Sequence, residues 1–149
     1  MNKLDSVRKG AWRMLLVSRA RISEKIDREL LAADVVCFDW YDVLLRLEEA
    51  NGRLKMGDLA NRVLTSRSGL TRLADRLEAA GLILREHCEQ DRRVVFAVLT
   101  ENGRKAREEA WQVYEPALIR HFGRYISEQD AAVIQNALAR TLEEDRESM

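Results

Sequence analysis

The segment from Ser66 to Glu78 carries side chains that suit contact with a nucleic acid. Leu70, Leu73 and Leu77 recur at three- and four-residue spacing, which predicts a helix with one apolar face. The other face carries Ser68, Thr71, Arg72, Asp75 and Arg76, with Ser66 and Arg67 near the helix start. Arginine forks bind guanine edges and phosphates, and small hydroxyls bind phosphates. The segment therefore predicts a helix that packs by one face and contacts DNA by the other.

A second charged cluster, Asp91-Arg92-Arg93, lies between two apolar runs. The runs Leu82–Leu84 and Val94–Leu99 are candidate strands, and the polar stretch from about Glu86 to Arg93 connects them. This pattern predicts a β-hairpin with a charged tip. Taken alone, the tip could be a polar loop with an incidental ion pair.

A short helix is expected over residues 56–64, directly before the polar-faced helix. Thr65 or Ser66 begins that second helix, and Ala79-Ala80-Gly81 closes it. Two short helices, the second with a polar face, followed by a hairpin are typical of a winged helix-turn-helix.

The chain resembles the MarR family of bacterial transcriptional regulators. The resemblance rests on residues from the helix-turn-helix to the end of the hairpin: Leu59-Ala60, Ser66, Ser68, Gly69, Thr71-Arg72, Asp75-Arg76-Leu77-Glu78, Gly81-Leu82 and Leu99-Thr100-x-x-Gly103. It implies that Ser66, Arg67, Ser68, Thr71, Arg72 and Arg76 contact DNA in the major groove. It also implies that Asp91, Arg92 and Arg93 form a wing tip. There Asp91 would pair with Arg93 or a nearby arginine, and Arg92 would enter the minor groove.

Long helical patterns flank this central region. One covers residues 4–32, and another runs from about Arg104 to Phe122, where Pro116 is either a kink or the first turn of a new segment. A helix from Phe38 to Ala50, which Asp39 can cap, a short strand at 53–55 and a last helix after Ser127 complete the pattern. We predict a mainly α fold with a small β-hairpin wing, as one domain over residues 1–149. The DNA-binding lobe would be about 39–100, and residues 4–32 and 104–146 would form a homodimer.

Composition limits the other classes. The chain has 149 residues, of which 46% are hydrophobic and 34% charged, as expected for one globular domain. Its net charge of zero argues against a broadly basic, non-specific nucleic-acid binder, with acids such as Glu143, Glu144, Asp145 and Glu147 offsetting local arginines. The apolar runs are short, and the first residues have no signal-peptide core, so we expect a cytoplasmic protein. Phosphate-binding glycine loops, nucleophile elbows and paired metal motifs are absent from the sequence, so we expect no enzyme activity, cofactor or metal.

Many transcriptional regulators respond to a small-molecule effector. The resemblance implies an effector crevice between the dimer helices and the DNA-binding lobe, near Trp12, Trp40 and Tyr41. One branch of the family responds to urate or related purines, and its ligand set resembles Trp12, Asp58, Arg93 and Arg104 here. We therefore expect a small aromatic or anionic effector that releases a repressor from its operator.

The sequence also allows other roles for these residues. The aromatic residues could simply pack in the core. Cys37 or Cys88 could serve a thiol-based redox sensor. The chain could also be a ligand-binding helical dimer without a DNA function.

Overall fold

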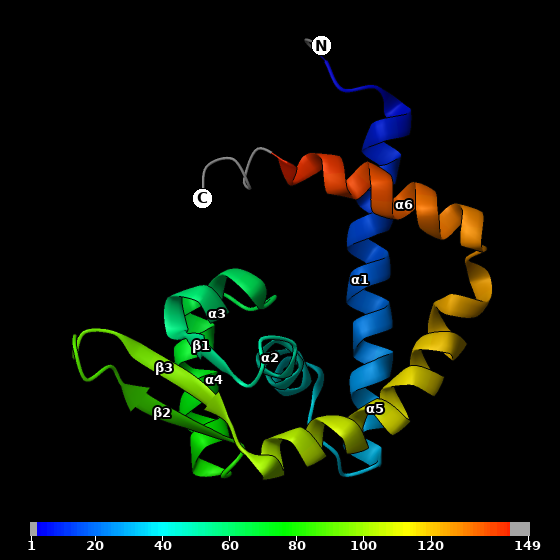
Figure 1. Cartoon of the computed structure of the whole chain (residues 1–149). Coiled ribbons are helices and arrows are strands. Elements are labelled where there is room, and N and C mark those ends of the chain that lie inside the picture. The colour runs from blue at the N-terminus through cyan, green and yellow to red at the C-terminus, as the bar shows by residue number, and fades with distance from the viewer. Residues whose placement is uncertain (1–2, 144–149) are drawn as a thin grey trace.

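The computed structural model describes residues 3–143, which fold into six α-helices, one short 3-10 helix and three strands within that range (Figure 1). In chain order the elements are α1 (Ser6–Ala32), α2 (Phe38–Glu49), β1 (Arg53–Lys55), α3 (Met56–Arg62), α4 (Arg67–Ala79), β2 (Ile83–His87), β3 (Val95–Leu99), α5 (Glu101–His121), η1 (Gly123–Tyr125) and α6 (Glu128–Thr141). The mainly helical fold with a small β-hairpin is confirmed. The acids Glu144, Asp145 and Glu147 and the end of the expected 104–146 segment lie outside the described residues.

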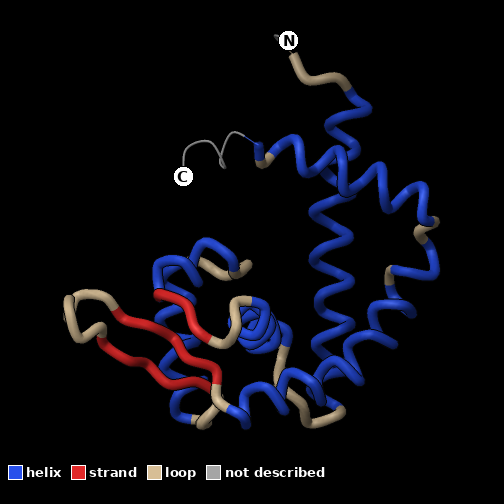
Figure 2. The backbone as a smooth tube through the Cα atoms, in the orientation of Figure 1, coloured by secondary structure: helices blue, strands red, loops and turns tan. Residues whose placement is uncertain are grey.

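The strands form one antiparallel sheet of order β1-β3-β2 beside α2, α3 and α4 (Figure 2). Leu54 of β1 pairs with Ala97, and Arg85 of β2 pairs with the same residue from the other side. The core of this lobe is built from buried aliphatic side chains of α2, α3, α4 and the sheet: Val43, Leu44, Leu47, Leu59, Leu70, Ala74, Leu77, Ile83 and Ala97. The sheet thus holds the hairpin next to α4.

Two helix starts differ from the sequence predictions. Asp39 does not cap α2; it lies in the first turn, and the carboxylate of Asp27 in α1 accepts the N–H of Phe38 instead at 3.0 Å. The helix expected from about Arg104 begins at Glu101, because the Thr100 hydroxyl accepts the N–H of Gly103 and caps it there. Ser66, one of the two predicted starts, is the N-cap of α4.

Strand β2 extends further than the run Leu82–Leu84 predicts. It continues through Glu86 and His87, which pair with Phe96 and Val95 of β3. These residues are polar because β2 is an edge strand of the sheet and their side chains face solvent. The connecting loop is therefore shorter than the predicted stretch from Glu86 to Arg93.

Helix α5 leads from the end of β3 past α2 and along α1 (Figure 1). Pro116 lies inside this continuous helix, so it does not begin a new helical segment. Arg107 of α5 pairs with Glu48 of α2, and Arg120 pairs with Glu29 of α1. Buried Ile26, Leu30, Tyr41, Ala110 and Ala117 form a second core cluster at this junction. Helix α5 thus connects the sheet-containing lobe to the long helix α1.

The first half of α1 and much of α6 expose apolar side chains in the single chain. Trp12 is 59% exposed and Val133 is 67% exposed. Other exposed apolar side chains on these helices are Val7, Met14, Leu15, Leu16, Ile134 and Leu138. These two helices therefore present apolar surface that the described chain does not cover by itself.

Candidate nucleic-acid interface

Helix α4 has the two faces that its sequence predicts. Leu70, Ala74 and Leu77 are buried against the lobe core. The predicted DNA-contacting side chains are all exposed: Ser66, Arg67, Ser68, Thr71, Arg72 and Arg76. This face is short, polar and freely accessible in the single chain.

The hydroxyl groups on this face also stabilise the helix. Ser66 Oγ accepts the N–H of Gly69 at 3.0 Å, and Thr71 Oγ1 donates to the carbonyl of Arg67 at 3.2 Å. Ser66 Oγ also lies 3.3 Å from Ser68 Oγ, so one of these two hydroxyls donates to the other and the second keeps its proton for an outside acceptor such as a phosphate oxygen.

The arginines of α4 differ in how they are held. Arg67 Nη2 donates to Asn61 Oδ1 of α3 at 2.8 Å, which joins the two helices of the motif. Within residues 3–143, the guanidinium groups of Arg72 and Arg76 have no hydrogen-bond or ion-pair partner. These two groups are therefore the available donors for an external anion or base edge.

Arg85 of β2 connects the hairpin to α4, and the sequence analysis did not single it out. Its Nη2 lies 2.5 Å from Asp75 Oδ1, and its backbone N–H donates to Glu78 Oε2 at 2.8 Å. The hydrogen bonds that Arg85 donates to Asp75, and then to Glu78, raise the pKa of Arg85. The sequence signal that could have identified it is its position two residues after Ile83, which places both side chains on the same face of the strand.

Side chains on both sides of the hairpin tip hold its conformation. Arg93 donates to Asp91 through both Nε, at 3.1 Å, and Nη2, at 3.3 Å, and this contact lowers the pKa of Asp91. His87 Nδ1 donates to the carbonyl oxygen of Arg92 at 3.0 Å. The partner of Asp91, which the sequence left open, is thus Arg93. The exposed guanidinium of Arg92 has no partner among the described side chains.

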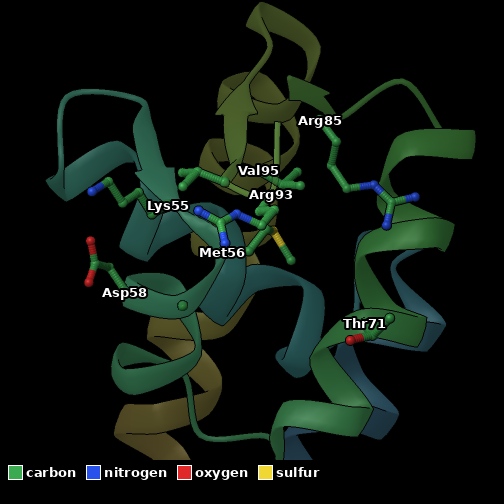
Figure 3. A pocket seen from close by; sticks show the side chains of 9 residues that line it. Lys55, Met56, Asp58, Thr71, Arg85, Arg93 and Val95 are labelled. Carbon is green, nitrogen blue, oxygen red and sulfur yellow. The ribbon is translucent and has the colours of Figure 1, made fainter. Parts of the chain in front are cut away.

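A pocket of about 470 Å³ lies between α3, α4 and the hairpin (Figure 3). It is lined by Lys55, Met56, Gly57, Asp58, Thr71, Arg85, Arg93, Val94 and Val95. The cationic groups of Lys55, Arg85 and Arg93 come from different elements, and Met56 and Val95 supply apolar surface. Two members of the predicted ligand set, Asp58 and Arg93, thus meet in one pocket.

The other predicted ligand residues lie elsewhere in the single chain. Trp12 is exposed on α1, and Arg104 of α5 is held by Glu101 and Glu108. Trp40 packs against the lobe core, whereas Tyr41 is 5% exposed and stacks on Trp111. Burial is the largest influence on Tyr41 and raises the pKa of its hydroxyl. One protomer therefore does not assemble all six residues at one pocket.

Cys37 is exposed at the start of α2, and Cys88 Sγ donates to Gln90 Oε1 at 3.3 Å in the hairpin. No group of three or more potential metal-ligating side chains occurs within the described range. No helix in residues 3–143 is long and apolar enough to cross a membrane.

Comparison with known proteins bears directly on this arrangement. The sequence pattern of the MarR family matches residues 41–95, from α2 to the start of β3. AbsC of Streptomyces coelicolor, a MarR family transcriptional regulator, is 31% identical in sequence. Its structure superposes with a TM-score of 0.83 over 98% of this chain and 99% of AbsC. The chain belongs to the MarR family. It is thus a member of a family of winged helix transcriptional regulators.

Other relatives agree with this family membership. The transcriptional repressor MdtR of Bacillus subtilis is 35% identical over 98 residues, which cover 64% of this chain and 63% of MdtR. Two further curated regulators match over only 39% and 45% of their lengths, so the chain spans about half of such relatives. Sco3205 of Streptomyces coelicolor, solved in complex with DNA, is 24% identical and superposes with a TM-score of 0.85 over 96% of this chain and 90% of Sco3205.

Proposed function

We propose that this MarR-family protein binds a pseudo-palindromic operator as a homodimer, with α4 in the major groove and the hairpin as a wing on the minor groove. The observation that supports this most is the pair of unpartnered guanidinium groups of Arg72 and Arg76 on the exposed face of α4. Unpaired arginines can form the bidentate contact to guanine or neutralise phosphates without first breaking an ion pair. The Sco3205 complex is consistent with the same use of this fold.

The wing contribution rests on Arg92. Because Arg93 is held by Asp91, Arg92 is the tip cation that is available for the narrow minor groove of an A·T-rich segment. The predicted contacts are thus Ser66, Arg67, Ser68, Thr71, Arg72 and Arg76 from α4, with Arg92 inserted and Asp91 and Arg93 shaping the tip.

A second copy of the chain would cover the exposed apolar side chains of α1 and α6. Such a two-fold dimer places two recognition helices about 34–36 Å apart, which is one turn of DNA. An operator bound in this way blocks RNA polymerase, so we propose repression as the outcome, as in the relative named repressor MdtR.

The effector that we propose is a small, flat anion. The pocket between α3, α4 and the wing offers the amine of Lys55, the acid Asp58 and apolar walls, whereas its Arg85 and Arg93 are already paired with acids. It shares Thr71 and Arg93 with the proposed DNA face. A ligand there favours the DNA-free state, because it binds that state better than the DNA-bound one. A purine such as urate could also donate an N–H to Asp58.

Selection from randomised duplexes tests the DNA proposal. We expect the protein to enrich an inverted repeat with half-sites about 10 base pairs apart. Enrichment of no sequence would contradict it. Urate, xanthine and salicylate are then added to the protein–DNA complex. We expect the Asp58→Ala variant to bind the operator as tightly as wild type, but urate and xanthine should no longer release it from the DNA. Peroxide with Cys37→Ser and Cys88→Ser separates this input from a thiol sensor: a response that one of these variants abolishes would replace the ligand proposal.

A further inference from the structure

Asp75 lies in the middle of the proposed DNA-contacting face of α4. With 100° per residue, the buried residues Leu70, Ala74 and Leu77 mark the core side. Asp75 points about 130° away from their mean direction, between the directions of Thr71 and Arg72. Its side chain is 61% exposed. A free carboxylate at this position would repel the phosphates that Arg72 and Arg76 are proposed to approach.

Arg85 holds this carboxylate from the neighbouring strand. Its guanidinium lies 2.5 Å from Asp75 through Nη2, and the side chain of Arg85 is only 28% exposed. The same residue contacts Glu78, with Nε 3.5 Å from Oε2 and the backbone N–H at 2.8 Å. Arg85 therefore joins two acids of α4 to β2 through its Nε and Nη2 atoms and its backbone N–H.

We propose that Arg85 is a positioning residue that neutralises Asp75, so that the centre of α4 can approach DNA. The proposal rests on the proposed function. The cluster holds the carboxylates of Asp75 and Glu78 and one guanidinium. Removal of Arg85 therefore leaves both carboxylates without this partner, next to the arginines of α4 that we propose to contact DNA. The effect on DNA is indirect, because it acts through the carboxylate of Asp75.

The reciprocal pair of variants Arg85→Met and Asp75→Asn tests this assignment. We expect R85M to weaken operator binding about tenfold at low salt and less at high salt, since the added repulsion is screened. We expect D75N alone to bind within about twofold of wild type, and R85M/D75N to recover most of the loss, because the unpaired charge is gone. A packing role for Arg85 would give no recovery.

The control is R85M/E78Q, which removes the other acid. Glu78 lies toward the hairpin, away from the centre of the face, so this double variant should stay as weak as R85M. If R85M does not fold, as judged by circular dichroism, R85K replaces it. The amine keeps one charge but cannot bridge both acids, so R85K should bind more weakly than wild type, and R85K/D75N should recover the loss.

The outcomes separate this proposal from the proposed function. Wild-type affinity in R85M, no recovery in R85M/D75N, or equal recovery in R85M/E78Q would each overturn the role of Arg85, provided that Arg72→Ala still weakens binding. Failure of wild-type protein to prefer any sequence would instead overturn the DNA proposal itself.

Discussion

The carboxylate of Asp42 in α2 accepts the backbone N–H of Leu64 at 2.9 Å, in the turn between α3 and α4. Asp42 is 4% exposed, and its other oxygen accepts Arg46 Nε at 3.2 Å. A buried acid thus fixes the turn that sets the angle between the two helices of the motif. The recognition helix depends on α2 through this contact as well as through apolar packing.

We expect Asp42→Ala to lower the free energy of unfolding by about 2–3 kcal/mol, because it leaves a backbone N–H and a guanidinium without their buried partner. Urea denaturation at fixed protein concentration measures this loss. Glu49→Ala is the matched control: Glu49 is exposed and pairs with the same Arg46, so its loss should be below about 1 kcal/mol. Equal losses in both variants would contradict the role of Asp42.

Gly103 occupies the first turn of α5, where the helix meets the loop before β2. A Cβ there would lie 2.1 Å from the carbonyl oxygen of Leu82, which is a backbone atom that cannot move aside cheaply. We expect Gly103→Ala to lower the melting temperature by several degrees, the shift that a loss of about 1–3 kcal/mol produces. Gly10→Ala in α1 is the control, since nothing lies within 4 Å of its Cβ position; it should be neutral or stabilising. A drop in Gly10→Ala as large as that in Gly103→Ala would argue against the steric explanation.

The ion pair at the wing tip has a measurable pH signature. Hydrogen bonds from Arg93 lower the pKa of Asp91, so the ionised, paired form gives the tip its order above the ordinary aspartate pKa. This order is lost as the pH falls through the lowered pKa in the folded state. Carboxyl NMR titration should show a pKa for Asp91 below the ordinary value, returning toward it in Arg93→Ala. An unshifted pKa in wild type would rule out a persistent pair in solution.

The wing is expected to act through Arg92, with His87 holding its carbonyl. Arg92→Ala should weaken operator binding and reduce the salt slope of log K by about one. His87→Leu should reproduce part of this effect, and His87→Asn, whose amide can donate in place of Nδ1, should restore it. Arg28→Ala in α1, outside the sheet-containing lobe, serves as the control for a generic loss of positive charge. Loss of affinity without a change of slope in Arg92→Ala would argue against a phosphate or groove contact.

The sequence allowed the prediction of the elements that rest on local patterns. The apolar spacing of Leu70, Leu73 and Leu77 and the cap at Ser66 placed α4 to within one residue of its start. The extent of β2 and the cap of α2 depend on contacts with β3 and with Asp27 of α1, which are distant along the chain, so local patterns could not show them. The 39–100 lobe and the dimerisation segments stay predictions.

The same division applies to the site. Residue type identified the arginines of α4 and the hairpin tip as candidate contacts, and their roles in DNA binding stay predictions. Which guanidinium groups are unpaired depends on contacts that the residue types do not show. Arg67 donates to Asn61, Arg93 pairs with Asp91, and Arg85 pairs with Asp75 and Glu78. Spacing alone could not distinguish a locked arginine from an available one. The family resemblance implied a ligand set whose six members do not share a pocket within one protomer.

The central claim is that Arg72 on α4 reads DNA sequence. The most direct test is fluorescence anisotropy of wild type and Arg72→Ala on the selected operator and on a scrambled duplex of equal length, across a salt series. We expect wild type to prefer the operator by about a thousandfold or more, and Arg72→Ala to lose about 1–3 kcal/mol on the operator and little on the scrambled duplex. Equal binding of wild type to both duplexes, or an unchanged operator affinity in Arg72→Ala, would contradict the assignment of α4 as the recognition helix.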